Sequence, residues 1–385
     1  MSFLENFTED LLEEAAIEIL QSLGYDYVFG PDISLGGDYE ERLDYREVVL
    51  GNRVKDALFR INKGIPAEAL EEAYRRIITF NSPMLEENNR SFHRLLTEGI
   101  DVSFAEDGNI RTKNVQIVDF SEEGIKNNEF LVINQFTIIE NEERRPDLLI
   151  FVNGIPLVLI EPKSASDENV GIESAYNQIQ TYKKDIPSLF NYNAFCILSD
   201  GINAKAGTIT SNEERYMNWR SIDGKVVEPL SNPQYEVMFG GMLQKHRLLD
   251  IIKNFILFQE SSVDEKDENG KKLGDKKTII KIMAAYHQYF AVKKAVEKTK
   301  EATKEDGDRK IGVIWHTQGS GKSFSMVFYT AGLVRELNNP TIVVITDRND
   351  LDDQLFSTFS KSQDILRQTP KQANIRKLTD SQKAT

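Results

Sequence analysis

The chain has 385 residues, 40% of them hydrophobic, which is enough for two or three domains that each bury a core. Its 47 basic and 61 acidic residues give a net charge of −14, which argues against indiscriminate binding of nucleic acid through a basic surface. The single cysteine, Cys196, excludes an internal disulfide and a cysteine-based zinc site. No apolar run approaches the about twenty residues that are needed to cross a bilayer. We therefore expect a cytoplasmic protein without membrane contact.

The first half of the chain predicts helices and strands in a mixed order. Thr8 is placed to cap a helix that runs to Leu23. Further helices are predicted over 45–61 and 66–80, and strands near 100–104, 115–120, 130–139 and 194–199. A hairpin that begins near residue 147 adds two more strands, and a four-strand sheet with flanking helices is enough for a domain core.

An apolar hairpin with charges at its open end is predicted at 145–164, RPDLLIFVNGIPLVLIEPKS. Asp147 opens the first strand, and Glu161 and Lys163 end the second. Burying such charges without partners costs several kcal/mol, whereas a divalent metal gives them a purpose. Two carboxylates can hold Mg²⁺ while Lys163 orients or deprotonates the attacking water, and the carbonyl of Pro162 could be a third ligand. This arrangement suits hydrolysis of a phosphodiester; the alternative is a surface hairpin with an ion pair at its mouth.

The register of this hairpin decides whether its charges share a face, because side chains alternate along a strand. A two-residue turn would place Asp147 on the opposite face from Glu161 and Lys163. A three-residue loop, 152–154, pairs Asp147 with Leu159 and places all three charges on one face. We therefore predict a type I turn whose glycine is left-handed and forms a bulge.

A helix is predicted over 172–186, IESAYNQIQTYKKDI, ending before Pro187. Its apolar stripe carries two polar residues, Gln178 and Tyr182, which should pack on the sheet beside Lys163. We interpret them as a polar pair that braces the active site or a DNA phosphate; the alternative is an ordinary amphipathic helix with a tolerated glutamine.

A polar linker is predicted at 261–277, SSVDEKDENGKKLGDKK, after a helix over 238–258, and it marks the domain boundary. Residues 271–310 then hold 12 basic and 6 acidic residues. This block is either a stripe that faces DNA or a solvated helix face with lysine-rich flanks.

A phosphate-binding loop is predicted at 311–323, IGVIWHTQGSGKS, between an apolar strand and a helix. The loop residues Gly319, Ser320 and Gly321 would face the phosphates. Lys322 would reach the β and γ oxygens, and Ser323 would bind Mg²⁺. The usual pattern has a glycine where His316 stands.

Two segments support this loop. A helix over 281–296 precedes it and carries Gln288, and a buried strand over Thr341–Thr346 follows it and ends in Asp347-Arg348. Strands that alternate with helices predict a parallel sheet, which places its ligands at the carboxyl ends of its strands.

Taken in order, these segments resemble the restriction (R, HsdR-type) subunit of type I restriction–modification enzymes, from about Glu9 to the end of the chain. The segments that carry the resemblance are NNEFLVINQFTI, the RPD…NGIPLVLIEPK hairpin, Gln178-x-x-x-Tyr182, RLLDIIKNFILF, AYHQYFAVKKAV, WHTQGSGKS and ITDRNDLDDQ. In that family a nuclease of the PD-(D/E)xK superfamily precedes a superfamily 2 translocase motor. The implied fold class is α/β, with a mixed sheet flanked by helices and then a RecA-like parallel α/β domain.

The resemblance implies a nuclease domain over 1–260, a linker over 261–277 and a partial first motor domain over 278–385. The last of these would contain a Q motif, a Walker A loop and motif Ia. No later apolar strand ends in the Asp-Glu pair of a Walker B motif. We therefore expect an N-terminal fragment that binds nucleotide but lacks full ATPase activity.

The resemblance also implies roles for single residues. The nuclease residues would be Asp147, Glu161 and Lys163, with Gln178 and Tyr182 as an accessory motif. In the motor, Gln288 would lie near the adenine, Lys322 and Ser323 would bind ATP-Mg²⁺, and Asp347-Arg348 would lie close to DNA. Nucleases of this superfamily often add a glutamate from the first helix, and Glu14 is the position that matches best.

The function implied is that of an ATP-dependent type I site-specific deoxyribonuclease, in which Mg²⁺-dependent cleavage of double-stranded DNA is coupled to translocation. The cofactors implied are Mg²⁺ and ATP, and the partners are double-stranded DNA and the methyltransferase (M) and specificity (S) subunits. Two alternatives remain open. The chain could belong to a helicase or translocase whose N-terminal region only binds DNA, or that region could be a docking module for the M and S subunits with a vestigial site.

Overall fold

The computed structural model describes residues 9–106, 108–163, 171–266, 272–337, 340–346 and 349–362. The chain forms two compact units, Met1–Lys253 and Asn254–Thr385, and each is considered by itself. Among the helices of the described ranges, none combines the length and the apolar character that a membrane span requires.

A six-stranded mixed sheet forms the core of the first unit. Its strands lie in the order β1 (Asp26–Phe29), β4 (Phe130–Asn134), β7 (Leu148–Val152), β8 (Ile155–Pro162), β9 (Phe195–Ser199) and β10 (Ala204–Gly207). β1 pairs with β4 and β8 pairs with β9 in parallel, and the other pairs are antiparallel. Every residue of β4, β7, β8 and β9 is buried, which explains their continuous rather than alternating apolar sequences. The predicted mixed sheet is confirmed, with short edge strands beyond the four expected.

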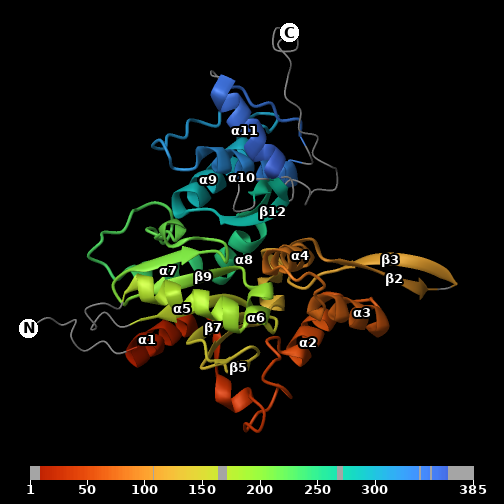
Figure 1. The fold of residues 1–385 in the computed structure, drawn as a ribbon. Coiled ribbons are helices and arrows are strands. Elements are labelled where there is room, and N and C mark those ends of the chain that lie inside the picture. Colours follow the sequence, from red (N-terminus) through yellow and green to blue (C-terminus); the bar gives the residue numbers. More distant parts are fainter. Residues whose placement is uncertain are drawn as a thin grey trace, which may run out of the picture. The chain divides into compact units, whose positions relative to one another are not determined.

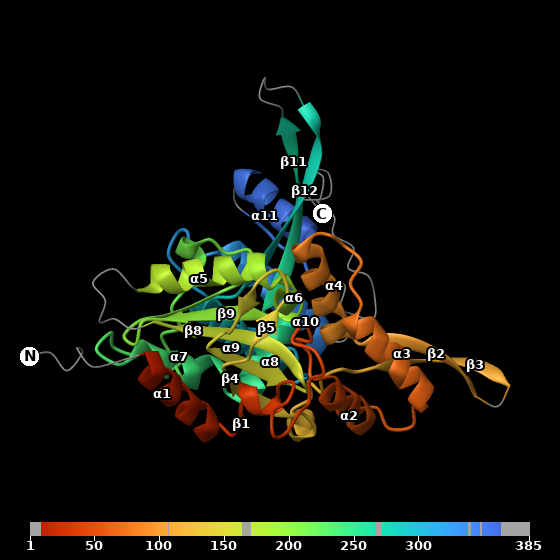
Figure 2. The ribbon, with the colours of Figure 1, turned by 60° about the horizontal axis from the view of Figure 1, so that its bottom comes forward.

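Helices cover both faces of this sheet (Figure 1). On one face, α5 (Ile172–Asp185) and α6 (Pro187–Tyr192) pack on β8, and α1 (Glu9–Ser22) contacts β1, β4 and β8 from the other (Figure 2). The remaining helices of this unit are α2 (Gly51–Ile61), α3 (Ala67–Ile78), α4 (Leu85–Glu98), α7 (Gln234–Met242) and α8 (Lys245–Asn254). The hairpin of β2 (Ile100–Glu106) and β3 (Asn109–Val115) extends outward beyond α3 (Figure 1).

Some predicted boundaries in this unit are wrong. The helix predicted over 45–61 begins at Gly51. The helix predicted over 238–258 is two helices, α7 and α8, and Gly241 in α7 lies so close to the Trp219 ring that a larger residue would not fit. Thr8, the predicted cap of the first helix, lies outside the described residues.

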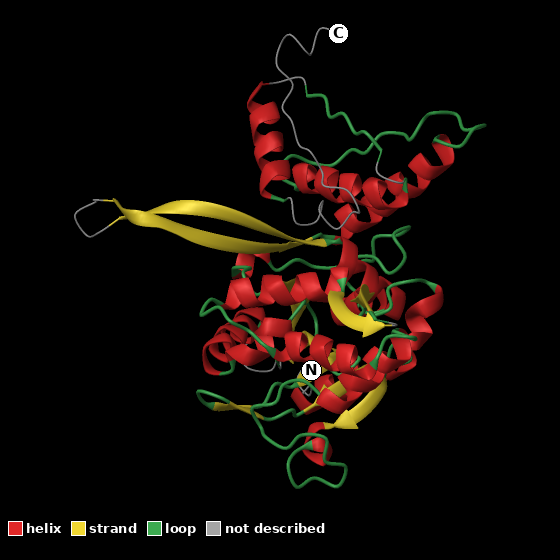
Figure 3. Cartoon of the chain, turned by 90° about the vertical axis from the view of Figure 1, so that its right-hand side faces the viewer, coloured by secondary structure: helices red, strands yellow, loops and turns green. Residues whose placement is uncertain are grey.

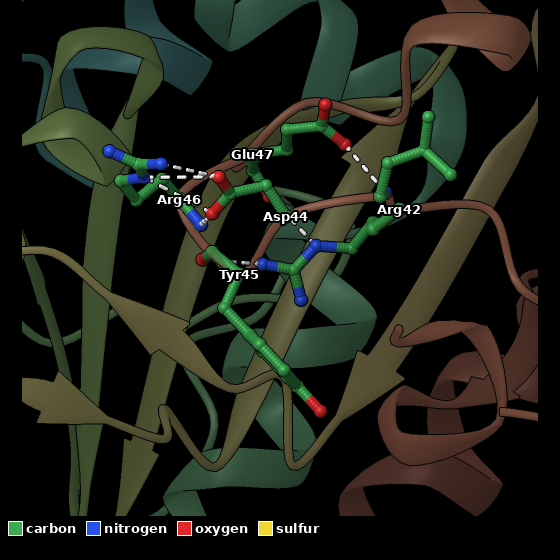
Figure 4. Close-up of polar contacts among 6 residues, drawn as sticks. Arg42, Asp44, Tyr45, Arg46 and Glu47 are labelled. Atoms are coloured by element: carbon green, nitrogen blue, oxygen red, sulfur yellow. Dashed lines mark hydrogen bonds and ion pairs between the residues drawn. The ribbon is translucent and has the colours of Figure 1, made fainter. Parts of the chain in front are cut away.

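Arg42 ties the loop between β1 and α2 to the segment that follows β4. The residue is 1% exposed, and its guanidinium donates hydrogen bonds to the carbonyl oxygens of Tyr45 and Glu47 within the loop, at 2.9 and 2.8 Å (Figure 4). It also donates to the carbonyl of Thr137, at 2.8 Å, and lies 3.9 Å above the centre of the Phe136 ring. Burial lowers the pKa of Arg42 to about 10, so the side chain stays cationic at neutral pH.

The second unit combines one long hairpin with helices (Figure 3). β11 (Ile256–Lys266) pairs antiparallel with β12 (Lys272–Met283), and the helices are α9 (Tyr286–Ala302), α10 (Lys322–Glu336) and α11 (Asn349–Lys361). The predicted linker over 261–277 is wrong, because most of that range lies in this hairpin, and the units divide at Lys253 rather than near residue 260. Its polar sequence lacks the apolar alternation by which a half-buried strand is recognised.

The buried strand predicted over Thr341–Thr346 is wrong in this structure. Residues 340–346 and the apolar strand predicted at the start of 311–323 form no pairing within the described ranges. Val313 is 94% exposed and Ile345 is 89% exposed. An apolar strand becomes buried only when neighbouring strands and helices cover it, and the described part of this unit supplies none that do so.

Candidate functional site

The turn of the β7–β8 hairpin differs from the one predicted. It has two residues, Asn153 and Gly154, with φ of 51° and 79°, and it joins the paired residues Val152 and Ile155. Two left-handed residues are the pattern of a type I′ turn, so the predicted three-residue loop is wrong.

A β-bulge in the second strand restores the register that the site needs. Phe151 faces Pro156, whereas Ile150 faces Val158, so β8 has one extra residue at this step. The shifted register pairs Leu148 with Ile160 and places Asp147 opposite Glu161. The two acids therefore lie side by side at the open end of the hairpin, which is the predicted outcome reached by a different device.

Lys163 lies between the two carboxylates. Its Nζ is 2.9 Å from Glu161 Oε1 and 3.5 Å from Asp147 Oδ2. A further acid, Glu9 at the start of α1, has Oε1 3.5 Å from the same nitrogen. Glu161 is fully buried, and the side chains of Asp147 and Lys163 are 19% and 13% exposed. The structure thus brings the three predicted side chains together in a pocket where acids outnumber the base.

Burial raises the pKa of both paired carboxyls. For Glu161, the neighbouring charge of Asp147 adds to the effect of burial, while Lys163 opposes it. For Asp147, burial raises the pKa and Lys163 partly offsets it. Burial acts to lower the pKa of Lys163, but the surrounding carboxylates outweigh burial and hold it above its usual range. Lys163 is therefore an ammonium in this arrangement.

The two carboxylates have the chemistry of a site for a divalent cation. Apart from contacts with Lys163 and with each other, Asp147 Oδ2 and both oxygens of Glu161 have no hydrogen-bond partner among the described residues. Buried carboxylate oxygens without donors are costly, and a hard cation is their natural partner. The described ranges hold no group of three or more His, Cys, Asp or Glu residues able to bind a metal. The remaining ligands would be water, phosphate or a backbone carbonyl, as is common for Mg²⁺. Pro162, whose carbonyl was the predicted third ligand, is buried at the end of β8 and pairs with Ser199 of β9.

The first helix presents Glu13 to the site rather than Glu14. Glu14 is exposed, whereas Glu13 is 8% exposed and accepts hydrogen bonds from Asn134 and Gln135, at 2.5 and 3.0 Å. Burial and the charge of Asp147 raise the pKa of Glu13, although the two hydrogen bonds oppose this. The predicted placement of Glu14 is therefore wrong. The sequence contained a signal that favours Glu13, because this residue shares an i, i+3, i+4 and i+7 stripe with the apolar residues Ala16, Ile17 and Leu20.

The helix α5 contributes the two polar residues that the sequence singled out. Tyr182 is 3% exposed, and its pKa is raised by burial and then by the charges of Glu161 and Asp147. A hydrogen bond with the half-buried Gln178 opposes that rise. The Tyr182 hydroxyl therefore stays protonated and remains a hydrogen-bond donor.

In the phosphate loop of the second unit, Lys322 hydrogen-bonds to the backbone of the loop itself. The helix α10 begins at Lys322, directly after Gly321, whose φ of 76° is left-handed, and Gly319 has a φ of 82°. The Lys322 Nζ donates to the carbonyls of His316 and Thr317, at 3.1 and 2.9 Å. Ser320 lies between the two glycines, and Ser323 lies in the first turn of α10. The predicted loop and helix are present, and Lys322 would have to leave these carbonyls to reach a phosphate.

Gln288 packs under this loop. Its Oε1 accepts from the backbone N–H of Ala285 at 2.8 Å, and its Nε2 donates to the carbonyls of Gly321 and Ser320, at 2.9 and 3.4 Å. The amide thus has protein partners on both of its polar atoms, and its role near an adenine stays a prediction. Asp347 and Arg348 lie outside the described residues.

Comparisons with known proteins agree with this division of the chain. Residues 6–215 match the model of the family described as the type I restriction enzyme R protein N terminus, and residues 287–385 match that of the SWI2/SNF2 ATPase. The chain is 40% identical over 374 residues to the type I restriction enzyme HindI endonuclease subunit of Haemophilus influenzae, covering 96% of this chain and 34% of that protein. It is 35% identical over 375 residues to the proposed type I restriction enzyme MjaIXP endonuclease subunit of Methanocaldococcus jannaschii, covering 91% of this chain and 34% of that protein. The chain thus spans about a third of the length of these relatives, and it belongs to the family of type I restriction enzyme R proteins.

Proposed function

We propose that the first unit is the DNA-cleaving nuclease of a type I restriction enzyme and hydrolyses phosphodiester bonds of double-stranded DNA with a divalent metal. One observation carries this proposal. Glu161 is fully buried beside the half-buried Asp147, three of their four oxygens lack sufficient donors, and Lys163 lies within 3.5 Å of both. The family match supports a restriction nuclease in general, and the geometry supports this pocket as its site.

Each residue of this site would have a separate role. Asp147 and Glu161 would hold the metal, which when bound supplies a Lewis acid for the phosphate and an activated water. Lys163 is held as an ammonium, so its part is to orient the water and offset the phosphate charge rather than to remove a proton. Tyr182 keeps a donor beside the acids, and Glu13 adds a carboxylate from α1 close to Asp147.

The second unit is proposed to bind ATP with Mg²⁺ through Lys322 and Ser323. The loop geometry and the match to the SWI2/SNF2 ATPase family support this assignment. In the whole protein, we propose that ATP-driven translocation is coupled to cleavage and that the M and S subunits supply modification and recognition of the DNA.

Binding of Mn²⁺ to the 385-residue chain tests the nuclease site, with cleavage measured in the assembled enzyme. Asp147→Asn and Glu161→Gln should each abolish Mn²⁺ binding and cleavage while leaving ATP binding intact. Lys322→Ala should instead abolish ATP binding and leave Mn²⁺ binding at the nuclease site intact. Variants that bind Mn²⁺ as well as the wild type after either substitution would refute the site and favour an N-terminal region that only binds DNA or partner subunits.

A further inference from the structure

We infer that Gln135 is a positioning residue that locks the Glu13 carboxylate against the β7–β8 hairpin. The inference deepens the proposed nuclease function and rests on it. Two consecutive residues, Asn134 and Gln135, donate their side-chain amides to the two different oxygens of Glu13, at 2.5 and 3.0 Å.

A regular strand cannot make this pair of contacts. Successive side chains of a strand point to opposite faces, so Asn134 and Gln135 would normally diverge. Asn134 is the last residue of β4 and pairs with Leu148. Gln135 has a φ of 54°, a left-handed conformation that non-glycine residues seldom adopt outside turns and functional sites. The reversal at Gln135 turns its side chain to the same carboxylate as its neighbour.

The backbone of Gln135 fixes the other half of the site. Its N–H donates to the carbonyl oxygen of Asp147 at 3.1 Å. One residue therefore holds Asp147 through its main chain and Glu13 through its side chain, and so links α1 to the first strand of the hairpin.

Neighbouring contacts hold this turn in place on both sides. The hydroxyl of Tyr27 donates to Asn134 Oδ1 at 3.0 Å, which directs the amide nitrogen of Asn134 toward Glu13. On the other side, the buried guanidinium of Arg42 stacks on Phe136 and donates to the carbonyl of Thr137. The strained residue is thus anchored before and after, as expected where the surrounding structure determines the conformation.

The two amides orient the Glu13 carboxylate but leave part of its hydrogen-bonding capacity free. Each carboxylate oxygen has two lone pairs, so each oxygen of Glu13 keeps one for a water molecule bound to a cation that Asp147 and Glu161 hold. Partners that orient a ligand in this way typically alter metal affinity by about 10- to 100-fold when they are removed. Gln135 would therefore set the affinity of the site for a divalent cation without touching the cation.

The test separates positioning from folding. Mn²⁺ binding to the 385-residue chain is measured from the electron paramagnetic resonance signal of free Mn²⁺ for the wild type, Gln135→Gly and Gln135→Met. Both variants should bind Mn²⁺ roughly 10-fold more weakly. The thermal midpoint of Gln135→Gly should stay close to that of the wild type, because glycine adopts a positive φ without strain. Arg309→Gly is the matched control, since Arg309 has a φ of 61° in the second unit; it should leave Mn²⁺ binding unchanged.

A double-mutant cycle with Glu13→Gln gives the decisive comparison. If Gln135 acts through Glu13, then Gln135→Met should cause no further loss of Mn²⁺ affinity in the Glu13→Gln background. Wild-type affinity in both Gln135 variants, or an equal loss in both backgrounds, would overturn the inference and leave the nuclease proposal standing. Absence of Mn²⁺ binding that depends on Asp147 in the wild type would instead overturn the nuclease proposal, and this inference with it.

Discussion

Glu161 Oε1 and Lys163 Nζ lie 2.9 Å apart at the end of a strand whose other residues are all apolar and buried. Asp147 joins them from the facing strand, so one largely buried ammonium lies between a fully buried carboxylate and a half-buried one. An uncompensated negative charge in such a place is costly.

Removing the lysine should make the fold depend on metal. Lys163→Ala leaves both carboxylates without their cation and should lower the free energy of unfolding by about 3 kcal/mol. Saturating Mn²⁺ should recover part of this loss, because a cation takes over the charge. Cleavage should be abolished, because Lys163 is proposed to orient the water and offset the phosphate charge. Thermal unfolding with and without Mn²⁺ measures the effect, and a Lys163→Ala chain that Mn²⁺ does not stabilise would contradict it.

Stability without metal should fall as the pH rises above about 4.5, the ordinary pKa of glutamate. The pKa of Glu161 is raised on folding, so between its unfolded and folded values the native state holds more protons than the unfolded state, and ionisation destabilises the fold. Glu161→Gln removes this group and should flatten the profile and raise stability at neutral pH. Lys163, whose pKa is also raised on folding, makes stability fall with rising pH in the same sense, but only above its ordinary pKa of 10.5. Denaturant unfolding over a pH series checks this; a steeper profile in the variant would contradict it.

Glu13 and Glu14 offer a matched pair on α1. Glu13→Gln should weaken Mn²⁺ binding and cleavage because Gln135 links the Glu13 carboxylate to the backbone of Asp147. Glu14→Gln makes the same chemical change one residue along on the exposed side of the helix and should leave both unchanged. Equal effects of the two substitutions would show that overall charge, rather than placement, is what matters.

Gln288 should govern affinity for phosphates rather than for the base. Its amide holds the carbonyls of Ser320 and Gly321, so Gln288→Ala should weaken binding of ATP, GTP and inorganic triphosphate by a similar factor of roughly ten, the effect of losing a hydrogen bond or two. Nucleotide titrations measure this. Gln259→Ala, which removes a side-chain contact to Ser362 elsewhere in the same unit, is the control. A loss confined to ATP would show instead that Gln288 reads the adenine.

The convergence of the two acids could be predicted because side chains alternate along a strand, so only an odd or even shift of the register matters. Either a three-residue loop or a two-residue turn with one bulge brings Asp147 and Glu161 to one face, and the apolar runs on each side fix the strands. The sequence does not show which device is used, because the bulge lies among residues, Pro156 to Val158, that are all buried and apolar. The left-handed Gln135 was equally hidden, since glutamine carries no signal for a positive φ.

The second unit was less predictable for a different reason. Val313 and Ile345 read as core residues because apolar runs usually are, but burial depends on what packs against a strand rather than on the strand itself. The β11–β12 hairpin was mistaken for a linker because its strands are mostly polar, although Asn269-Gly270 is a hairpin signal in the sequence.

The most direct test of the account is the anomalous scattering of Mn²⁺ in crystals of this chain. The account predicts a peak about 2.1 to 2.2 Å from carboxylate oxygens of both Asp147 and Glu161, lost in Asp147→Asn. A saturated crystal with no peak there, or with the acids turned to different sides of the sheet, would contradict it.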